Sequence, residues 1–183
     1  KGILEPDNAA AYLEFLLART PQISVVGIAG PGDPLCDPEL TLETLRRVHS
    51  AYPDLLLCLS TNGLNLPEHV DALAQTGVTH VTVTVNAVDP SVGRTIYGWV
   101  KLNGRRLRGR EAARLLLTRQ REAIAKLKAR GFIVKINTVV IPRINTEHVE
   151  SIAAEMADLG ADIMNCIPMI PVPNTPLEHL GSP

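Results

Sequence analysis

Residues 23–34, with the sequence ISVVGIAGPGDP, join a short apolar run to a glycine-rich polar turn, and this pattern decides the fold class. Apolar runs that end in polar or glycine-rich turns recur along the chain, at Ile23–Ile28, Leu55–Leu59, His80–Val85, Phe132–Val140 and Asp162–Ile167. Near-continuous runs of this length are typical of strands that are covered on both faces, as in a parallel sheet. We therefore predict five parallel strands.

Segments with helical periodicity separate these strands, at Asp7–Arg19, Pro38–Ser50, Pro67–Gln75, Pro90–Tyr97, Glu111–Arg130 and Thr146–Leu159. In the first segment, apolar residues such as Leu13 and Phe15 are expected to face the core. Gly77 is expected to end the third helix, and Thr146 to cap the last one. Alternating strands and helices predict right-handed crossovers, and therefore a parallel barrel or an open α/β sheet.

The order of elements begins with a helix, so we expect a barrel whose first strand is missing from this chain. A single domain is expected over residues 1–173, truncated at both ends, followed by an extended tail over residues 174–183. Tyr97–Arg110 breaks the alternation, because it is basic, contains glycines and lacks apolar periodicity. We predict a loop here, which is either a solvated surface insertion or a lid over an active site.

The composition argues against several classes of partner. The 183 residues carry 18 basic and 19 acidic side chains, and 3% of them are aromatic. This balance gives no electrostatic reason to expect nucleic acid or a membrane surface. The three cysteines, Cys36, Cys58 and Cys166, form no CxxC pair. We therefore expect reduced thiols in the cytoplasm, with Cys36 and Cys166 as small buried hydrophobic residues.

Glycines and polar side chains cluster where the predicted strands end, which is where parallel α/β folds bind ligands. Gly30 and Gly32 would let the backbone approach a ligand, and the Asp33 carboxylate suits an ammonium group. The other candidates are Ser60, Thr61 and Asn62 after the second strand, Asn86 after the third, Asn137 in the fourth, and Ile167, Pro168 and Met169 after the fifth. The polar candidates suit ribose hydroxyls or a carboxylate, and the apolar ledge suits a flat base.

Each candidate also has an ordinary structural explanation. GPGDP and STNG are common turns, and a single buried asparagine more often satisfies the backbone than a ligand. The convergence of these groups on one rim of the sheet favours a binding site. The five histidines share no metal-ligand spacing, and no Ser, His and Asp arrangement is supported, so we do not expect a hydrolase.

Several strings of this sequence resemble those of radical S-adenosylmethionine (SAM) enzymes of the NifB family, which act in nitrogenase cofactor biosynthesis. They are VGIAGPGDPL at 26–35, LCLSTNGL at 57–64, VTVTVNAVDP at 81–90, IYGWV at 96–100, GRR at 104–106 and KINTVVIP at 135–142. The match runs in order from near the first residue to Pro173. The resemblance implies a partial (β/α)6 TIM-like barrel and reductive cleavage of SAM to a 5′-deoxyadenosyl radical.

For members of this family, the resemblance implies fusion of two [4Fe-4S] clusters, with carbide insertion from SAM, into the precursor of the nitrogenase FeMo-cofactor. The implied cofactors are SAM and [4Fe-4S] clusters, namely one SAM cluster and two substrate clusters. Gly30, Gly32 and Asp33 would lie along the methionine end of SAM. Ser60, Thr61, Asn62, Asn86 and Asn137 would contact its ribose or carboxylate, and Ile167, Pro168 and Met169 would lie near the adenine.

Cys58 matches the family's cysteine that ligates one substrate cluster, although a cysteine within LLLCLST also fits simple packing. The implied partners are iron-sulfur cluster donor and cofactor carrier proteins of nitrogenase assembly, and a reductant protein. The family's CxxxCxxC motif, which holds the SAM cluster, is absent from these 183 residues. We therefore expect the chain alone to be inactive. Two alternatives stay open: a radical SAM enzyme with another substrate, and a non-catalytic barrel scaffold.

Overall fold

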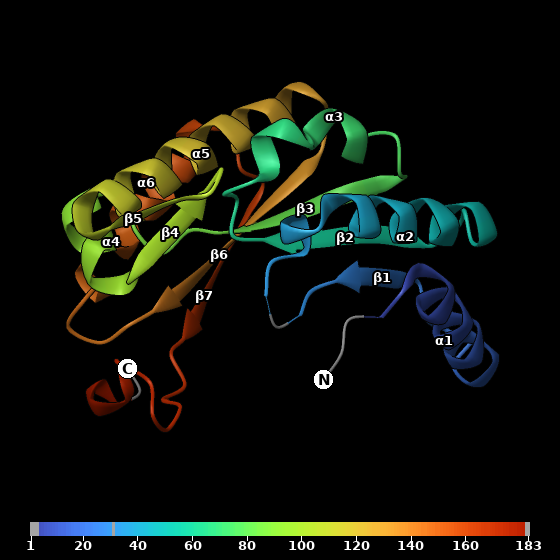
Figure 1. The fold of residues 1–183 in the computed structure, drawn as a ribbon, viewed down its shortest axis with the longest axis horizontal. Coiled ribbons are helices and arrows are strands. Elements are labelled where there is room, and N and C mark those ends of the chain that lie inside the picture. Colours follow the sequence, from blue (N-terminus) through green and yellow to red (C-terminus); the bar gives the residue numbers. More distant parts are fainter. Residues whose placement is uncertain (1–3, 31, 182–183) are drawn as a thin grey trace.

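A five-stranded parallel sheet forms the centre of the structure, a computed structural model that describes residues 4–30 and 32–181. The strands lie side by side in chain order, β1 (Val25–Ile28), β2 (Leu56–Thr61), β3 (Val78–Thr84), β6 (Ile133–Val140) and β7 (Ile163–Pro168) (Figure 1). Every pairing among them is parallel. The prediction of five parallel strands is confirmed. Their order in the sheet follows the chain, as it does in part of a parallel barrel.

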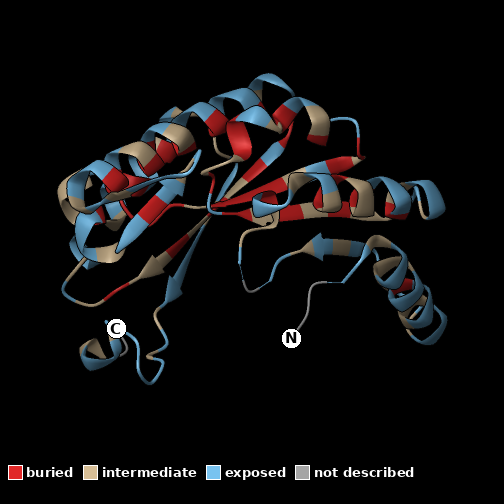
Figure 2. Ribbon diagram, viewed as in Figure 1, coloured by how far each residue is buried: buried red, intermediate tan, exposed pale blue. Residues whose placement is uncertain are grey.

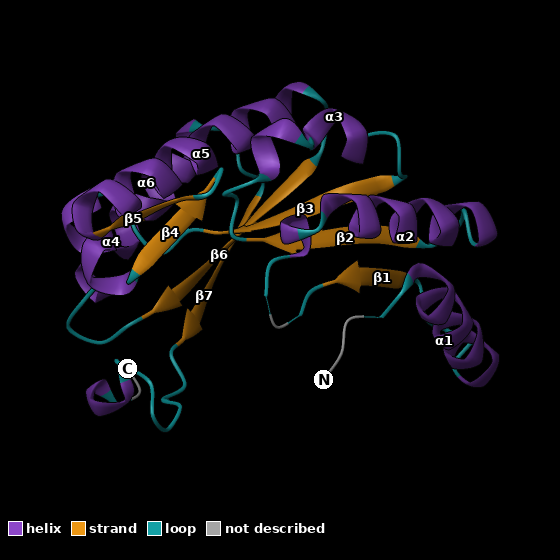
Figure 3. Cartoon of the chain, in the orientation of Figure 1, coloured by secondary structure: helices purple, strands orange, loops and turns teal. Residues whose placement is uncertain are grey.

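Helices cover one face of this sheet, and the other face stays open (Figure 3). The helices are α1 (Pro6–Arg19), α2 (Pro38–Ala51), α3 (Val70–Leu73), α4 (Pro90–Ile96), α5 (Gly109–Ala129) and α6 (Val149–Asp158). Leu57 and Leu59 of β2 are fully buried under the helices, whereas Cys58 and Ser60, which alternate with them, are only partly buried. We call the uncovered side the open face. In Figure 2 the buried bands along β2 alternate with paler ones, because successive residues face opposite sides of the sheet.

The predicted third helix is shorter than its sequence pattern indicated. A 3-10 turn over Leu66–Glu68 leads into α3, which ends at Leu73 with Ala74 as its C-cap. The prediction that Gly77 ends this helix is therefore wrong. Gly77 instead has a φ of +79° in the turn before β3, where a Cβ would lie 2.4 Å from the ring of His49. The glycine is required by the turn and by the packing of that imidazole.

Two other local predictions are wrong. Thr146 lies in a 3-10 turn ahead of α6 and donates its hydroxyl to the Ile141 carbonyl oxygen at 3.3 Å, so it does not cap the helix. Phe15 is 51% exposed rather than buried, and the Arg19 guanidinium stacks 4.5 Å from its ring centroid. Leu13 alone among the residues of α1 is buried, because the main contact of this helix is with α2.

Tyr97–Arg110 forms a β-hairpin, so the prediction of a loop is wrong. Strand β4 (Trp99–Leu102) pairs antiparallel with β5 (Arg105–Arg108). Asn103 and Gly104 join them with φ values of +49° and +77°, as a tight two-residue hairpin turn requires. Val100 and Leu107 alternate with exposed residues, as inward-facing residues of a hairpin do, and these two side chains pack against α5.

The C-terminal residues beyond β7 are irregular except for a 3-10 turn over Glu178–Leu180. Residues 182 and 183 of the predicted extended tail lie outside the described residues. Among the described residues, no helix has both the length and the apolar character that a membrane crossing needs.

Candidate cofactor site at the carboxyl edge of the sheet

The Asp33 carboxylate ties the loop after β1 to the loop after β2. Its oxygens accept hydrogen bonds from the Thr61 hydroxyl at 2.9 and 3.0 Å and from the Asn62 backbone N–H at 2.5 Å. The same carboxylate accepts the Leu35 N–H at 3.0 Å and so begins a 3-10 turn over Pro34–Cys36. Two predicted groups of site residues, 28 and 29 positions apart in sequence, are thereby brought into direct contact.

These bonds define what else Asp33 can do. A carboxylate offers about four acceptor positions, and three protein donors already use most of them. A ligand ammonium group could share the remaining capacity. The first effect of Asp33 is to hold the two loops in register, and its predicted contact with the methionine end of SAM stays a prediction.

The backbone at Gly30 and Gly32 is not covered by side chains of the described residues. The two residues form an isolated antiparallel bridge across position 31, and Gly32 has a φ of +98° that disfavours any other residue. A Cβ built on either glycine would meet no atom within 4 Å. Protein packing therefore does not require a glycine at position 30, and the open space suits a ligand that lies against the main chain.

Thr61, Asn62 and Ser60 differ in how much of their polar capacity is free. Thr61 is buried, and its hydroxyl oxygen also accepts the Gly63 N–H at 3.1 Å. Asn62 is exposed, and its side-chain oxygen accepts the Leu64 N–H at 2.8 Å in a local turn. Ser60 lies on the open face in register with Thr82 of β3. Asn62 and Ser60 are thus the more accessible of the three.

Asn86 is 8% exposed and connects the ends of β3 and β6. Its side-chain oxygen accepts the Val139 N–H at 2.8 Å, and its own N–H donates to the Tyr97 hydroxyl at 3.2 Å. Burial raises the pKa of Tyr97 to about 12, so this phenol is neutral at physiological pH. The Asn86 oxygen is committed to the backbone, and its side-chain amide also lies beside the Tyr97 phenol. The predicted contact of Asn86 with a ligand stays a prediction.

Asn145 was missed by the sequence analysis and completes this connection. It is fully buried, and its NH₂ donates to the carbonyl oxygens of Asn86 at 3.0 Å and Val139 at 2.9 Å. Its side-chain oxygen accepts the Ile141 N–H at 2.6 Å. All of these partners are backbone groups, so Asn145 is a structural residue that fixes the carboxyl end of β6.

Asn137 of β6 has a buried side-chain oxygen with no hydrogen-bond partner in the part of the chain that the structure describes. An unpaired buried acceptor costs about 1–3 kcal/mol, and a ligand donor would remove that cost. Its register partners are Thr84 on β3 and Asn165 on β7, so three polar residues form a row across adjacent strands. Asn165 is exposed and was also missed, although it interrupts the apolar run of β7.

Cys58 lies on the open face, closer to the amino ends of the strands than this polar row. Its thiol donates to the Val26 carbonyl oxygen, with sulfur and oxygen 3.6 Å apart. Burial raises the pKa of the thiol, and the positive charge of Lys135 offsets part of that rise. His80 is its register partner on β3, and sequence analysis singled out neither His80 nor Lys135. Their shared face becomes evident only from the strand register.

The other two cysteines are exposed, so the prediction that Cys36 and Cys166 are buried hydrophobic residues is wrong. Cys36 ends the 3-10 turn after Asp33, and Cys166 lies on the edge strand β7. Within residues 4–30 and 32–181, no three His, Cys, Asp or Glu side chains gather as metal ligands would. The described residues therefore do not fit a [4Fe-4S] cluster held by three cysteines.

The predicted apolar ledge lies at the far side of the sheet from the glycine loop. Ile167 and Pro168 end β7 and are exposed, and the Met169 N–H donates to the Val140 carbonyl oxygen at 3.0 Å. Strands β1 and β7 are at opposite ends of the strand order. A ligand that touches both the ledge and Gly30 would therefore have to extend across the open face, from β7 to β1.

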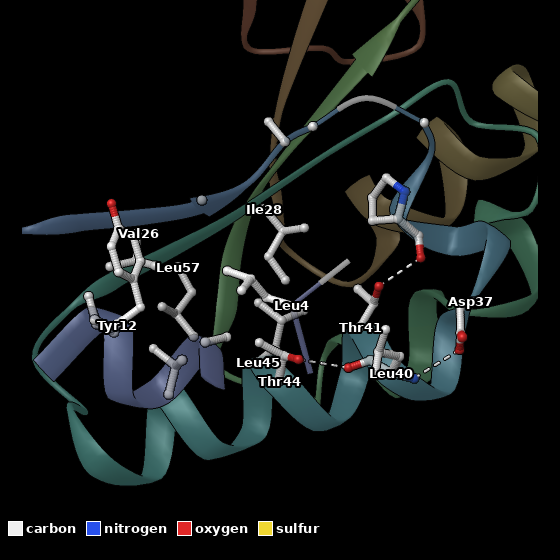
Figure 4. Close-up of a pocket in the computed structure, with 18 of the residues that line it drawn as sticks. Leu4, Tyr12, Val26, Ile28, Asp37, Leu40, Thr41, Thr44, Leu45 and Leu57 are labelled. Carbon is white, nitrogen blue, oxygen red and sulfur yellow. Dashed lines mark hydrogen bonds between the residues drawn. The ribbon is translucent and has the colours of Figure 1, made fainter. Parts of the chain in front are cut away.

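A pocket of about 560 Å³ lies under β1, between the sheet and helices α1 and α2 (Figure 4). Its floor is apolar, with Val26, Leu45 and Leu57 among its lining residues. The Thr41 hydroxyl at one end donates to the Pro34 carbonyl oxygen at 2.7 Å. Because Val26 and Leu57 face the helices, this pocket is on the side of the sheet opposite Cys58. Gly30, Gly32 and Asp33 are also among its lining residues.

Comparison with known proteins gives consistent results. The model of the radical SAM superfamily matches residues 2–156. The chain is 46% identical over 181 residues to the FeMo cofactor biosynthesis protein NifB of Chlorobaculum tepidum, covering 99% of this chain and 43% of that protein. It is 46% identical over 171 residues to NifB of Klebsiella pneumoniae, covering 93% of this chain and 36% of that protein. The chain thus spans less than half the length of these relatives.

A solved structure has the same fold. TsrM from Kitasatospora setae, a radical SAM methyltransferase with cobalamin and a [4Fe-4S] cluster bound, superposes with a TM-score of 0.65 over 95% of this chain and 33% of that one. The two sequences are 19% identical, so this likeness shows the fold alone. It confirms the predicted partial TIM-like α/β fold.

Proposed function

Because this chain belongs to the radical SAM superfamily, we propose that it is part of an enzyme of FeMo-cofactor biosynthesis whose open sheet face binds SAM. The 46% identity to NifB of Chlorobaculum tepidum extends over 99% of the chain, and this supports the proposal for the whole described fold. The observation that carries the SAM site is the set of bonds from Asp33 to Thr61 and Asn62, which joins two predicted ligand loops.

The residues at this edge fit SAM on two structural grounds. The bare backbone at Gly30 and Gly32 leaves room for the methionine end. The unpaired oxygen of Asn137 lacks a donor that a ribose hydroxyl would supply. When bound and reduced by one electron, SAM supplies methionine and a 5′-deoxyadenosyl radical. In this arrangement Asp33 positions the loops, the accessible Ser60 and Asn62 and the Asn86 amide orient the ligand, and Ile167, Pro168 and Met169 cover its base.

For the substrate, we propose that Cys58 ligates one of two [4Fe-4S] clusters that are fused, with a carbide from SAM, into the FeMo-cofactor precursor. Its place on the open face and the neighbouring positive charge of Lys135 support an anionic iron-sulfur substrate at that position. No step is assigned to a SAM cluster, because the described residues do not gather three thiolates. Iron-sulfur cluster donor and cofactor carrier proteins are the partners that such a reaction requires.

The test uses the full-length protein, purified without oxygen and reconstituted with iron and sulfide. SAM and a reductant are added, and both 5′-deoxyadenosine and the ability of the product to activate cofactor-free nitrogenase are measured. We expect both. Formation of 5′-deoxyadenosine without nitrogenase activation would point to a radical SAM enzyme with another substrate. Absence of both would leave the scaffold alternative.

A further inference from the structure

The hairpin formed by β4 and β5 concentrates positive charge that the proposed SAM site does not use. Residues 97–110 contain five basic side chains and no acidic one, although the whole chain has a formal net charge of −1. Its cations are Lys101, Arg105, Arg106 and Arg108, Arg110 follows in the first turn of α5, and all five are exposed. None of them takes part in the ion pairs found among the described residues.

The two faces of the hairpin differ in chemistry. Val100 and Leu107 are paired in register and turn inward onto α5, where Val100 is 6% exposed. The alternate positions form the outer face, which consists of Trp99, Lys101, Arg106 and Arg108. The Arg106 guanidinium stacks 4.2 Å from the ring centroid of Trp99, which is itself 52% exposed. Exposed tryptophan and arginine are the residue types that dominate the energy of protein interfaces.

The root of the hairpin touches the loops that carry candidate site residues. Tyr97 lies two residues before β4, and its hydroxyl accepts the hydrogen bond from the backbone N–H of Asn86 at the end of β3. Leu64, which follows the STNG turn of β2, packs in the same cluster as Val100. Figure 1 shows β4 and β5 beside α5, at the opposite end of the molecule from α1. A partner on the outer face would therefore sit next to the carboxyl edge of the sheet.

We propose that the outer face of this hairpin docks an acidic electron-transfer protein, which delivers the electron consumed by SAM cleavage. This inference rests on the proposed function, in which one electron breaks the C–S bond of SAM to give methionine and the 5′-deoxyadenosyl radical. Clustered cations that form no ion pair among the described residues attract an acidic partner and speed its encounter in a salt-sensitive way. The overall charge of −1 and the 3% aromatic content favour a protein over a nucleic acid.

Direct binding is the first test, with a purified acidic bacterial ferredoxin as the probe and the full-length protein as the target. Arg106→Glu should raise the Kd for oxidised ferredoxin by about tenfold and weaken its dependence on salt. The matched control is Arg19→Glu, which removes an equally exposed cation stacked on an aromatic ring, at the far end of the molecule. Lys101→Glu keeps the Arg106–Trp99 stack and should also weaken binding, so a local folding defect cannot explain the result.

Equal Kd values for Arg106→Glu and Arg19→Glu would overturn the proposal. So would tight, hairpin-dependent binding of poly(U) RNA combined with ferredoxin binding that the variants leave unchanged. The second readout is 5′-deoxyadenosine formation with either reduced ferredoxin or dithionite as the electron source. Arg106→Glu should slow the ferredoxin reaction and leave the dithionite reaction at the rate of the unaltered protein. A failure of dithionite to support cleavage in the unaltered protein would contradict the proposed function, while the Kd measurement would still decide the docking site.

Discussion

Gly27 of β1 and Cys58 of β2 are register partners, and a Cβ at residue 27 would lie 2.7 Å from the Cys58 sulfur. That distance is shorter than carbon and sulfur can approach without one of them moving. The absence of a side chain at Gly27 therefore allows the thiol to lie over β1, where it donates to the Val26 carbonyl oxygen. The direction in which Cys58 presents its sulfur depends on this glycine.

Gly27→Ala should rotate the Cys58 thiol and lower the iron bound as substrate cluster, with a stability loss of about 1 kcal/mol. Iron content and electron paramagnetic resonance after reconstitution measure the loss of the substrate cluster. The reaction rate of the metal-free thiol with a disulfide reagent measures the change in exposure of the Cys58 thiol. Gly98→Ala is the control, since a Cβ there meets no atom within 4 Å. Identical thiol reactivity in both variants would show that Gly27 does not position Cys58.

Cys58→Ala in the full-length protein should abolish one substrate cluster while leaving SAM cleavage near its original rate, because the predicted SAM groups lie closer to the carboxyl edge. Cluster content by Mössbauer spectroscopy and 5′-deoxyadenosine by chromatography provide the two readouts. Cys166→Ala serves as a control, because that cysteine is exposed on β7, three places from β2 in the strand order, and is the register partner of the buried Thr138. Survival of both the cluster and cleavage would rule out the ligand assignment.

Asp33→Ala should cost about 1–3 kcal/mol of folding stability, because the Thr61 hydroxyl and the Asn62 N–H would lose their acceptor. The affinity for SAM should fall as the two loops separate. Urea unfolding and calorimetric titration with SAM check these outcomes. Asp37→Ala, a neighbouring carboxylate that caps α2 through the Leu40 N–H at 3.1 Å, should lose some stability and keep its SAM affinity. Equal SAM affinities in the two variants would contradict the role given to Asp33.

Asn137→Ala and Asn145→Ala should behave in opposite ways. Asn145 makes three hydrogen bonds, two of them buried and one partly buried, so its loss should destabilise the SAM-free protein by about 3 kcal/mol. Asn137 has an unpaired buried oxygen, so its loss should change stability by less than about 1 kcal/mol. SAM should stabilise the unaltered protein against denaturant more than it stabilises Asn137→Ala, since at a given concentration the ligand that binds more tightly raises stability more. A large loss of stability in SAM-free Asn137→Ala would mean that its oxygen has a protein or water partner.

Much of the fold follows from local pattern. Apolar runs such as Phe132–Val140 and the helical segments between them predicted five parallel strands, because parallel strands buried on one or both faces need continuous apolar sequence. The hairpin over Tyr97–Arg110 was missed although Asn103-Gly104 is a strong turn signal. Val100 and Leu107 are the apolar residues that face inward there, one from each strand. Two strands of four residues give too short an alternating pattern to be recognised among the surrounding arginines.

The sequence by itself determined the parallel α/β architecture, the family to which the chain belongs and the loops in which ligand groups reside. Only the tertiary structure decided which of those groups meet. It shows that the Asp33 carboxylate accepts a hydrogen bond from Thr61 and that the Asn86 oxygen is already bonded to the backbone. It also shows that Lys135 and His80 share a face with Cys58. The physical reason is that side chains alternate between the faces of a strand. A shift of one residue in register moves every group to the other side, and register is fixed by packing between distant segments rather than by any one of them.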